Sequence, residues 1–194
     1  MLDKLKKLNV GFFNIKKDYS YIFKAFLLLV VLGVFMDNPG NSLEFNMFQL
    51  DDAVRLNLRP PIIMLGGILL GPTAGALAGG LIDIISYNIW HSDLDYILVL
   101  TFITMFRGFL SGYIFHNIFA ELNAKSVISA VSLPHVITSG FAIPTVLCYY
   151  YDISLFNNIL LRLAIQSVFI PLYIISIYYI VKGIKKTQDF KILH

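Results

Sequence analysis

Six apolar segments follow one another along the chain, and each is long enough, or nearly long enough, to cross a lipid bilayer as a helix. A transmembrane helix needs about 20 mostly apolar residues. The segments are 19–36, 56–70, 73–87, 96–120, 127–151 and 155–182. They predict one all-α, polytopic integral membrane domain with six transmembrane helices. Because the second and third segments are short and only Gly71 and Pro72 separate them, a re-entrant pair is the alternative at that place.

The composition agrees with lipid as the solvent. Of the 194 residues, 57% are apolar and 14% are charged, and the mean hydropathy is +0.73. Soluble domains contain roughly 45–50% apolar and about 25% charged residues, and a soluble chain this short cannot bury such an excess. Disorder is excluded because it requires low hydrophobicity. The single cysteine, Cys148, excludes an intramolecular disulfide.

The positions of the basic residues predict the orientation. Lysine and arginine near the ends of spans stay on the cytoplasmic side. With six spans, one side receives most of the basic residues, namely Lys4, Lys6, Lys7, Lys16, Lys17, Lys24, Lys125, Lys182, Lys185, Lys186 and Lys191. The opposite loops are acidic, with Asp37, Glu44, Asp51, Asp52, Asp93, Asp95 and Asp152. We therefore expect both termini to be cytoplasmic.

The chain divides into three parts. Residues 1–18 are a basic amphipathic segment, expected to lie on the inner leaflet and to be followed by an uncleaved first helix, because no A-x-A-like signal-peptide site is present. Residues 19–182 are the six-helix bundle, and 183–194 are a cytoplasmic tail. The long outer loop 37–59 carries apolar side chains that we expect to cover a pocket as a lid. These are Phe45, Met47, Phe48 and Leu50.

Small residues recur every fourth position in the second and third segments. Gly67, Gly71, Gly75 and Gly79 have this spacing, and Pro72 is suited to the start of a helix. In lipid, such a stripe lets helix backbones approach closely. General helix packing explains the stripe without any further function.

This arrangement resembles the second and third helices of the substrate-binding S components of energy-coupling factor (ECF) vitamin transporters, most closely the folate-type group. The matching residues are Pro61, Gly71, Pro72, Gly75, Gly79 and Asp83, and a second match lies in the last helix at Arg162 and Pro171. Two features depart from the pattern. The Phe-Pro-Gly stretch after the third helix is replaced by Trp90-His-Ser-Asp-Leu-Asp-Tyr96. The Ala-x-x-x-Ala of the first helix is absent, because the residue four positions after Ala25 is Leu29.

The resemblance implies a function. The chain would capture a vitamin from outside the cell, with folate as the lead and other B vitamins or precursors as alternatives. It would work with a membrane coupling subunit and two ATPase subunits, in the plasma membrane of a bacterium, and would release substrate by toppling in the bilayer. ATP would be used by the partners, so no cofactor is expected in this chain.

Four ionisable residues fall near mid-depth of the predicted bundle. They are Asp83, Arg107, His135 and Arg162. Such residues are costly in lipid and usually face a partner or a polar cavity. We expect Asp83 to pair with Arg107, which leaves Arg162 nearer the pocket for an anionic ligand group, since guanidinium fits a carboxylate. Pairing of Asp83 with Arg162, with a purely structural role, is the alternative.

Other polar and aromatic residues complete the predicted substrate site. Aromatic rings stack on a flat heterocycle and amides read its hydrogen-bonding edge. The candidate substrate-binding residues are Arg162, Gln166, Asn158, Tyr150, Asn88, Trp90, Arg107 and His135. For Tyr150 the competing interpretation is an interfacial aromatic belt, and for His135 it is a buried core histidine. The structural candidates are Asp83, Gly67, Gly71, Pro72, Gly75, Gly79 and Pro171.

Motifs of catalysis are missing from the sequence. It contains no G-x-x-x-x-G-K-[ST], no H-E-x-x-H and no G-x-S-x-G, and its four histidines are too far apart to predict a metal site. We therefore expect a non-enzyme that binds no metal and no nucleic acid. Two alternatives to substrate capture are a scaffolding membrane protein without a pocket and a stand-alone proton-coupled transporter that uses Asp83 and His135.

Overall fold

The computed structural model describes residues 19–38, 43–45, 54–56, 58–90, 95–119, 121–151 and 154–192. The helices are α2 (Tyr19–Met36), α3 (Arg59–Leu70), α4 (Pro72–Trp90), α5 (Leu98–Tyr113) with its π-helical continuation η2 (Ile114–Phe119), α6 (Ala124–His135) with the π-helical η3 (Val136–Ala142) and α7 (Ile143–Tyr151), and α8 (Leu155–Ile192). Within the described part of the chain these elements form six helical rods, as predicted.

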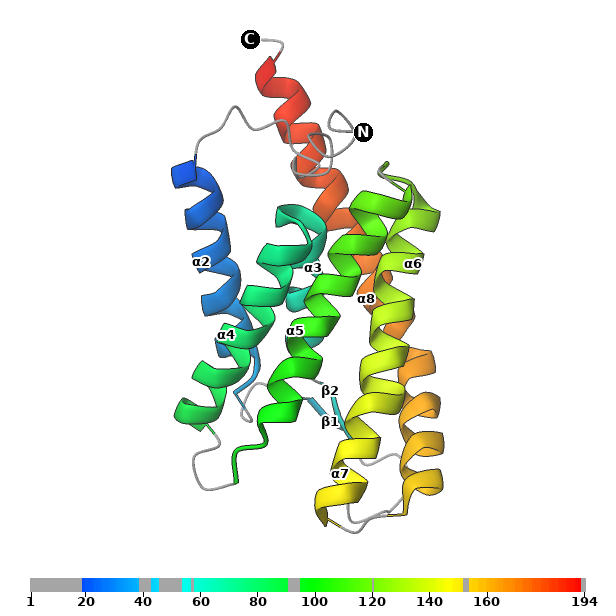
Figure 1. The fold of residues 1–194 in the computed structure, drawn as a ribbon. Coiled ribbons are helices and arrows are strands. Elements are labelled where there is room, and N and C mark those ends of the chain that lie inside the picture. Colours follow the sequence, from blue (N-terminus) through cyan, green and yellow to red (C-terminus); the bar gives the residue numbers. More distant parts are fainter. Residues whose placement is uncertain are drawn as a thin grey trace, which may run out of the picture.

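The rods lie side by side in one bundle (Figure 1). The start of α2 and the end of α8 lie at the same end of the bundle, here called the terminal end, and α8 extends beyond the other helices there (Figure 1). The opposite end, where α4 finishes and α5 begins, is here called the distal end. The last residues of α8 show that the predicted tail 183–194 is helical as far as Ile192. The predicted interfacial segment 1–18 lies outside the described residues.

The second rod, α3, is shorter than the sequence predicted. It begins at Arg59 instead of residue 56, because Pro60 and Pro61 occupy the first helical turn, where proline's missing N–H is tolerated. Residue 56 instead belongs to a short antiparallel hairpin of β1 (Leu43–Phe45) and β2 (Val54–Leu56), in which Leu43 faces Leu56. The sequence had predicted only a loop here. Of its lid candidates, Phe45 is in β1, and Met47, Phe48 and Leu50 lie outside the described residues.

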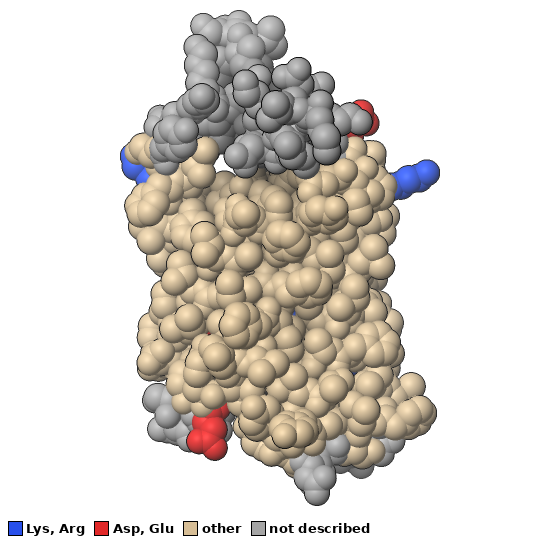
Figure 2. Space-filling model, in the orientation of Figure 1, with Lys and Arg blue, Asp and Glu red and all other residues tan. Residues whose placement is uncertain are grey.

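The surface of the bundle is that of a membrane protein. Lysine, arginine and acidic side chains are visible only toward the two ends of the face shown in Figure 2, and a broad uncharged band separates them. Among the described residues, three helices are long and apolar enough to cross a bilayer, namely Leu98–Phe119, Ala124–Tyr151 and Asn158–Lys186. Ile22–Met36 and Arg59–Leu70 are shorter apolar helices. Large apolar side chains such as Phe23, Phe102 and Phe156 are exposed. The chain is therefore a multi-pass membrane protein.

The larger of two buried apolar clusters among the described residues lies toward the terminal end. There α3, η2, α6 and the second half of α8 contribute a buried cluster that includes Met64, Ile68, Phe115, Val131 and Ile177. This packing holds the rods together at one end. The distal half of the bundle is free to contain polar groups.

The glycine stripe of α3 and α4 packs directly on the backbone of α5. A Cβ atom built on Gly75 would lie 2.6 Å from the carbonyl oxygen of Gly108, and one built on Gly79 would lie 2.5 Å from that of Thr104. A Cβ atom built on Gly67 would likewise come too close to backbone atoms of Gly108 and Gly112. The stripe therefore meets small residues on α5 that the sequence analysis had not singled out.

Gly71 has a different role in this region. Its φ is +99°, a left-handed conformation that favours glycine, and its N–H donates to the carbonyl of Gly67 at the end of α3. Pro72 then begins α4. This turn reverses the chain and sets α3 beside α4.

We predict that Gly75→Ala lowers the melting temperature of the detergent-solubilised protein, because the added methyl group displaces the α5 backbone. Overpacking of this kind costs about 1–3 kcal/mol. Gly66→Ala is the matched control, since its Cβ would meet its nearest neighbours at 3.8 Å, an ordinary contact. Alanine is also the better helix former. Equal melting temperatures for the two variants would show that the helices do not cross as closely as described.

Candidate ligand-binding cavity

A cavity of about 600 Å³ lies inside the bundle, between α3, α4, α5, the α6–η3–α7 rod and α8. The apolar part of its wall comes mostly from α5, α7 and α8. The polar and ionisable residues that line it are Arg59, Asp83, Thr104, Arg107, His135, Ser139, Asn158, Arg162, Gln166 and Tyr173. Five of the eight predicted substrate-binding residues are in this set, so the fold brings Arg107, His135, Asn158, Arg162 and Gln166 to one place.

An ion-pair network forms one wall of the cavity. Arg59, the first residue of α3, donates from Nη1 to Asp37 Oδ2 at 3.0 Å and from Nη2 to Asp83 Oδ1. The second oxygen of Asp83 accepts a hydrogen bond from Thr101 Oγ1 at 2.5 Å, and that hydroxyl is 2.5 Å from the Tyr96 hydroxyl. The network therefore ties the end of α2 and the start of α3 to α4 and α5.

The predicted pairing of Asp83 with Arg107 is wrong. Asp83 is held by Arg59, which the sequence placed at the end of the predicted outer loop. The loop ends with the Arg59 side chain directed into the bundle, where it reaches two carboxylates. The sequence carries one relevant signal, because the two prolines after Arg59 mark a helix start. Nothing in the sequence indicated the direction of the Arg59 side chain, or the part that Asp37 has in the network.

Arg107 is held by uncharged partners instead. Its Nε donates to Thr138 Oγ1 at 2.8 Å, and its Nη2 donates to Ser139 Oγ at 2.7 Å. Both hydroxyls belong to η3, and Thr138 in turn donates to the carbonyl of Pro134 at 2.6 Å. Proline inside a helix leaves backbone groups unpaired, and π-helical turns of this kind are often found at functional sites. The turn after Pro134 therefore directs two neighbouring hydroxyls toward Arg107.

The α8 side of the cavity carries amides and a third arginine. Arg162 Nε donates to Asn158 Oδ1, one turn earlier, at 2.8 Å. Gln166 lies one turn further along α8, and its Oε1 is buried without a hydrogen-bond partner among the described residues. His135, at the end of α6, has a buried Nδ1 that also has no hydrogen-bond partner among the described residues. His135 also contacts the Tyr173 ring edge-on, with 5.3 Å between the ring centroids.

The other three predicted substrate residues do not line this cavity. The Asn88 amide donates to the carbonyl of Ile84 on its own helix at 2.7 Å, and Trp90 Nε1 donates to the carbonyl of Val34 at 3.1 Å. Tyr150 is exposed at the distal end. The Trp90 bond fits packing of α4 against α2, and the exposed Tyr150 fits an interfacial aromatic residue. Pro171, a structural candidate, lies inside α8.

A second, smaller cavity of about 280 Å³ lies on the distal side of the ion-pair network. It is lined by Asp95, Tyr96 and Tyr151 among others, and it shares Arg59 and Asp83 with the larger cavity. The Arg59–Asp83 pair is therefore part of a wall between the two spaces. Among the described residues no group of three His, Cys, Asp or Glu side chains is placed to hold a metal ion.

The fold matches that of a solved crystal structure. The crystal structure of FolT bound with folic acid superposes with a TM-score of 0.66 at 20% sequence identity, over 81% of this chain and 90% of the FolT chain. A likeness at this identity establishes the fold, so the chain has a FolT-like membrane fold. Comparisons with protein-family sequence patterns and with curated protein sequences find no match.

A double-mutant cycle tests the ion-pair network. Arg59→Gln leaves two buried carboxylates without their cation, so we predict a clear loss of melting temperature in detergent. Adding Asp83→Asn restores part of that loss, with a coupling energy of about 0.5–3 kcal/mol. The same cycle with Arg107→Gln in place of Arg59→Gln is the control, and it shows little coupling. Coupling of Asp83 to Arg107 alone would contradict the assignment.

Proposed function

We propose that this chain is the membrane-embedded substrate-capture subunit of an ECF-type transporter, and that it binds a vitamin, with folate as the lead candidate. The observation that carries the proposal is an internal cavity lined by arginines and amides within a FolT-like fold. Its volume is in the usual range for small-molecule sites, about 300–1,000 Å³. The folate-type motifs of α3, α4 and α8 support the same conclusion from the sequence, and the matching FolT structure contains folic acid.

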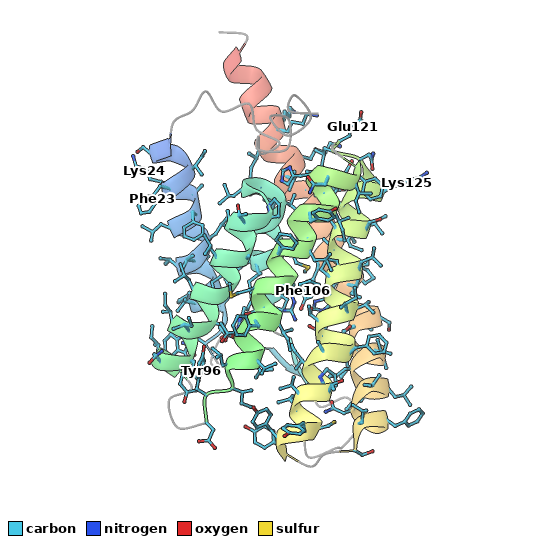
Figure 3. The ribbon with its side chains drawn as sticks, in the orientation of Figure 1. Phe23, Lys24, Tyr96, Phe106, Glu121 and Lys125 are labelled. Carbon is cyan, nitrogen blue, oxygen red and sulfur yellow. The ribbon has the colours of Figure 1, made fainter. Side chains whose placement is uncertain are left out.

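The placement of charge supports capture from outside. Lys24 and Lys125 lie at the terminal end of the bundle, and Tyr96 lies at the distal end (Figure 3). By the positive-inside rule the terminal end is cytoplasmic. The cavity lies in the distal half, opposite the apolar cluster of the terminal end, and would therefore receive its ligand from the outer side of a bacterial plasma membrane.

Energy for uptake would come from other subunits. The sequence has no P-loop, so we assign ATP hydrolysis to two partner ATPases that act through a membrane coupling subunit. Release of the vitamin inward would follow from toppling of the whole bundle.

The two alternative functions fit the geometry less well. A scaffolding protein has no use for a cavity in which polar side chains converge. A proton-coupled transporter requires Asp83 to gain and lose a proton, whereas Asp83 is engaged by Arg59 and by the Thr101 hydroxyl. Substrate capture accounts both for the polar cavity and for an Asp83 that is held by Arg59.

Binding and uptake separate these functions experimentally. We predict that the purified chain binds folic acid, or another B vitamin from a panel, saturably and one-to-one in isothermal titration calorimetry without ATP. In proteoliposomes the chain alone should not accumulate the bound vitamin. Accumulation against a gradient by the chain alone would favour the proton-coupled alternative, and absence of binding to every vitamin would contradict substrate capture.

A further inference from the structure

The three arginines of the cavity differ in what balances their charge. Arg59 is held between two carboxylates, Asp37 and Asp83. Arg162 contacts the amide oxygen of Asn158. Arg107 donates to the hydroxyls of Thr138 and Ser139, and no carboxylate of the described residues forms an ion pair with it. Hydroxyl groups orient a guanidinium but do not neutralise it.

The position of Arg107 makes its charge costly. Arg107 is only 2% exposed, and it belongs to α5, one of the helices that are long and apolar enough to cross the membrane. Its neighbour Phe106 lies about midway between the end that carries Lys125 and the end that carries Tyr96 (Figure 3). A cation at such a depth normally has an anionic partner or faces a polar cavity. Arg107 lines the cavity, so a ligand can reach it.

We infer that Arg107 is the anion-binding residue of this cavity and that it takes a carboxylate group of the ligand. This deepens the proposed function and rests on it, because it assumes that the cavity is the capture site. It also reverses the sequence-based expectation, in which Arg162 was to bind the anion and Arg107 was to hold Asp83.

Two buried polar atoms in the same cavity as Arg107 indicate what else the ligand carries. Gln166 is 6% exposed and His135 is 4% exposed, and Gln166 Oε1 and His135 Nδ1 have no hydrogen-bond partner among the described residues. Both residues line the cavity. A buried amide oxygen requires a donor, so the ligand supplies an N–H or O–H group to Gln166.

The same part of the wall is aromatic. Phe169 and Tyr173 stack with 6.3 Å between their ring centroids, and His135 meets Tyr173 edge-on. Flat rings pack favourably against such a surface. Together with the cation and the unpartnered amide oxygen, this wall defines the ligand class as a flat, aromatic carboxylic acid that carries a hydrogen-bond donor.

The first experiment compares folic acid with its neutral dimethyl ester on the full-length protein in detergent. A charge-assisted hydrogen bond contributes about 1.5–3 kcal/mol, which is roughly 10- to 150-fold in affinity. We expect Arg107→Met to weaken folic acid binding by that factor and to change ester binding less than about threefold. Arg162→Met is the comparison variant, and it should retain the preference for the acid over the ester.

A structural role for Arg107 predicts a different pattern. If Arg107 mainly held η3 against α5, Arg107→Met would lower the melting temperature of the ligand-free protein and weaken the acid and the ester equally. We expect the ligand-free melting temperature to stay the same or rise, because an unbalanced buried charge is removed. Arg107→Lys, which keeps the charge without the guanidinium fork, should recover part of the preference for the acid.

The second experiment does not depend on folate. Millimolar benzoate at pH 7 should raise the melting temperature of the wild-type protein and of Arg162→Met but not that of Arg107→Met, and benzamide, its neutral counterpart, should raise none of them. If benzoate acts through Arg107 while folic acid does not bind, the inference stands and folate is excluded as the substrate. If folic acid binds and Arg107→Met keeps the preference for acid over ester, or if the wild type responds to neither acid, the inference is overturned.

Discussion

The pairing of Arg59 with Asp37 and Asp83 is the interaction on which the organisation of the distal half depends. Inside a bilayer an isolated charge is costly, so two carboxylates and one guanidinium brought to one point fasten the elements that carry them. Those elements are the end of α2, the start of α3 and the middle of α4, and Thr101 adds α5. Because this network engages Asp83 through Arg59, Asp83 does not pair with Arg107, and no carboxylate of the described residues forms an ion pair with that arginine. The pairing of Asp83 with Arg59 therefore leaves the cavity with an arginine, Arg107, whose charge no described carboxylate balances.

Close backbone contact at the glycines sets how α5 packs against α4. Gly75 and Gly79 of α4 lie against Gly108 and Thr104 of α5, which fixes the rotation of α5 about its own axis. With that face of α5 against α4, Arg107 faces η3 and the cavity. Apolar packing at the terminal end, glycine contacts in the middle and ion pairing toward the distal end thus each hold a different level of the same bundle.

Much of this architecture could be predicted because lipid imposes simple rules on sequence. Apolar length predicted six helical rods, and depth along the spans identified Arg107, His135 and Arg162, which line one cavity. The partner of Asp83 could not be predicted, because pairing depends on side-chain direction and Arg59 lay where the predicted outer loop meets the second apolar segment. The β-hairpin and the π-helical turn after Pro134 were missed for a related reason, since both depend on tertiary contacts. Asn88 and Trp90 were misplaced because depth alone does not show which face of α4 turns inward.

The most direct test of a preformed capture site for an aromatic acid is native mass spectrometry of the protein purified from its own cells in mild detergent. We predict one additional small molecule per chain, released on unfolding and identified as an aromatic carboxylic acid, and its absence from Arg107→Met purified in the same way. A wild-type chain that carries no such molecule, even after incubation with a cell extract, would contradict the account. So would an adduct that Arg107→Met retains at the same occupancy.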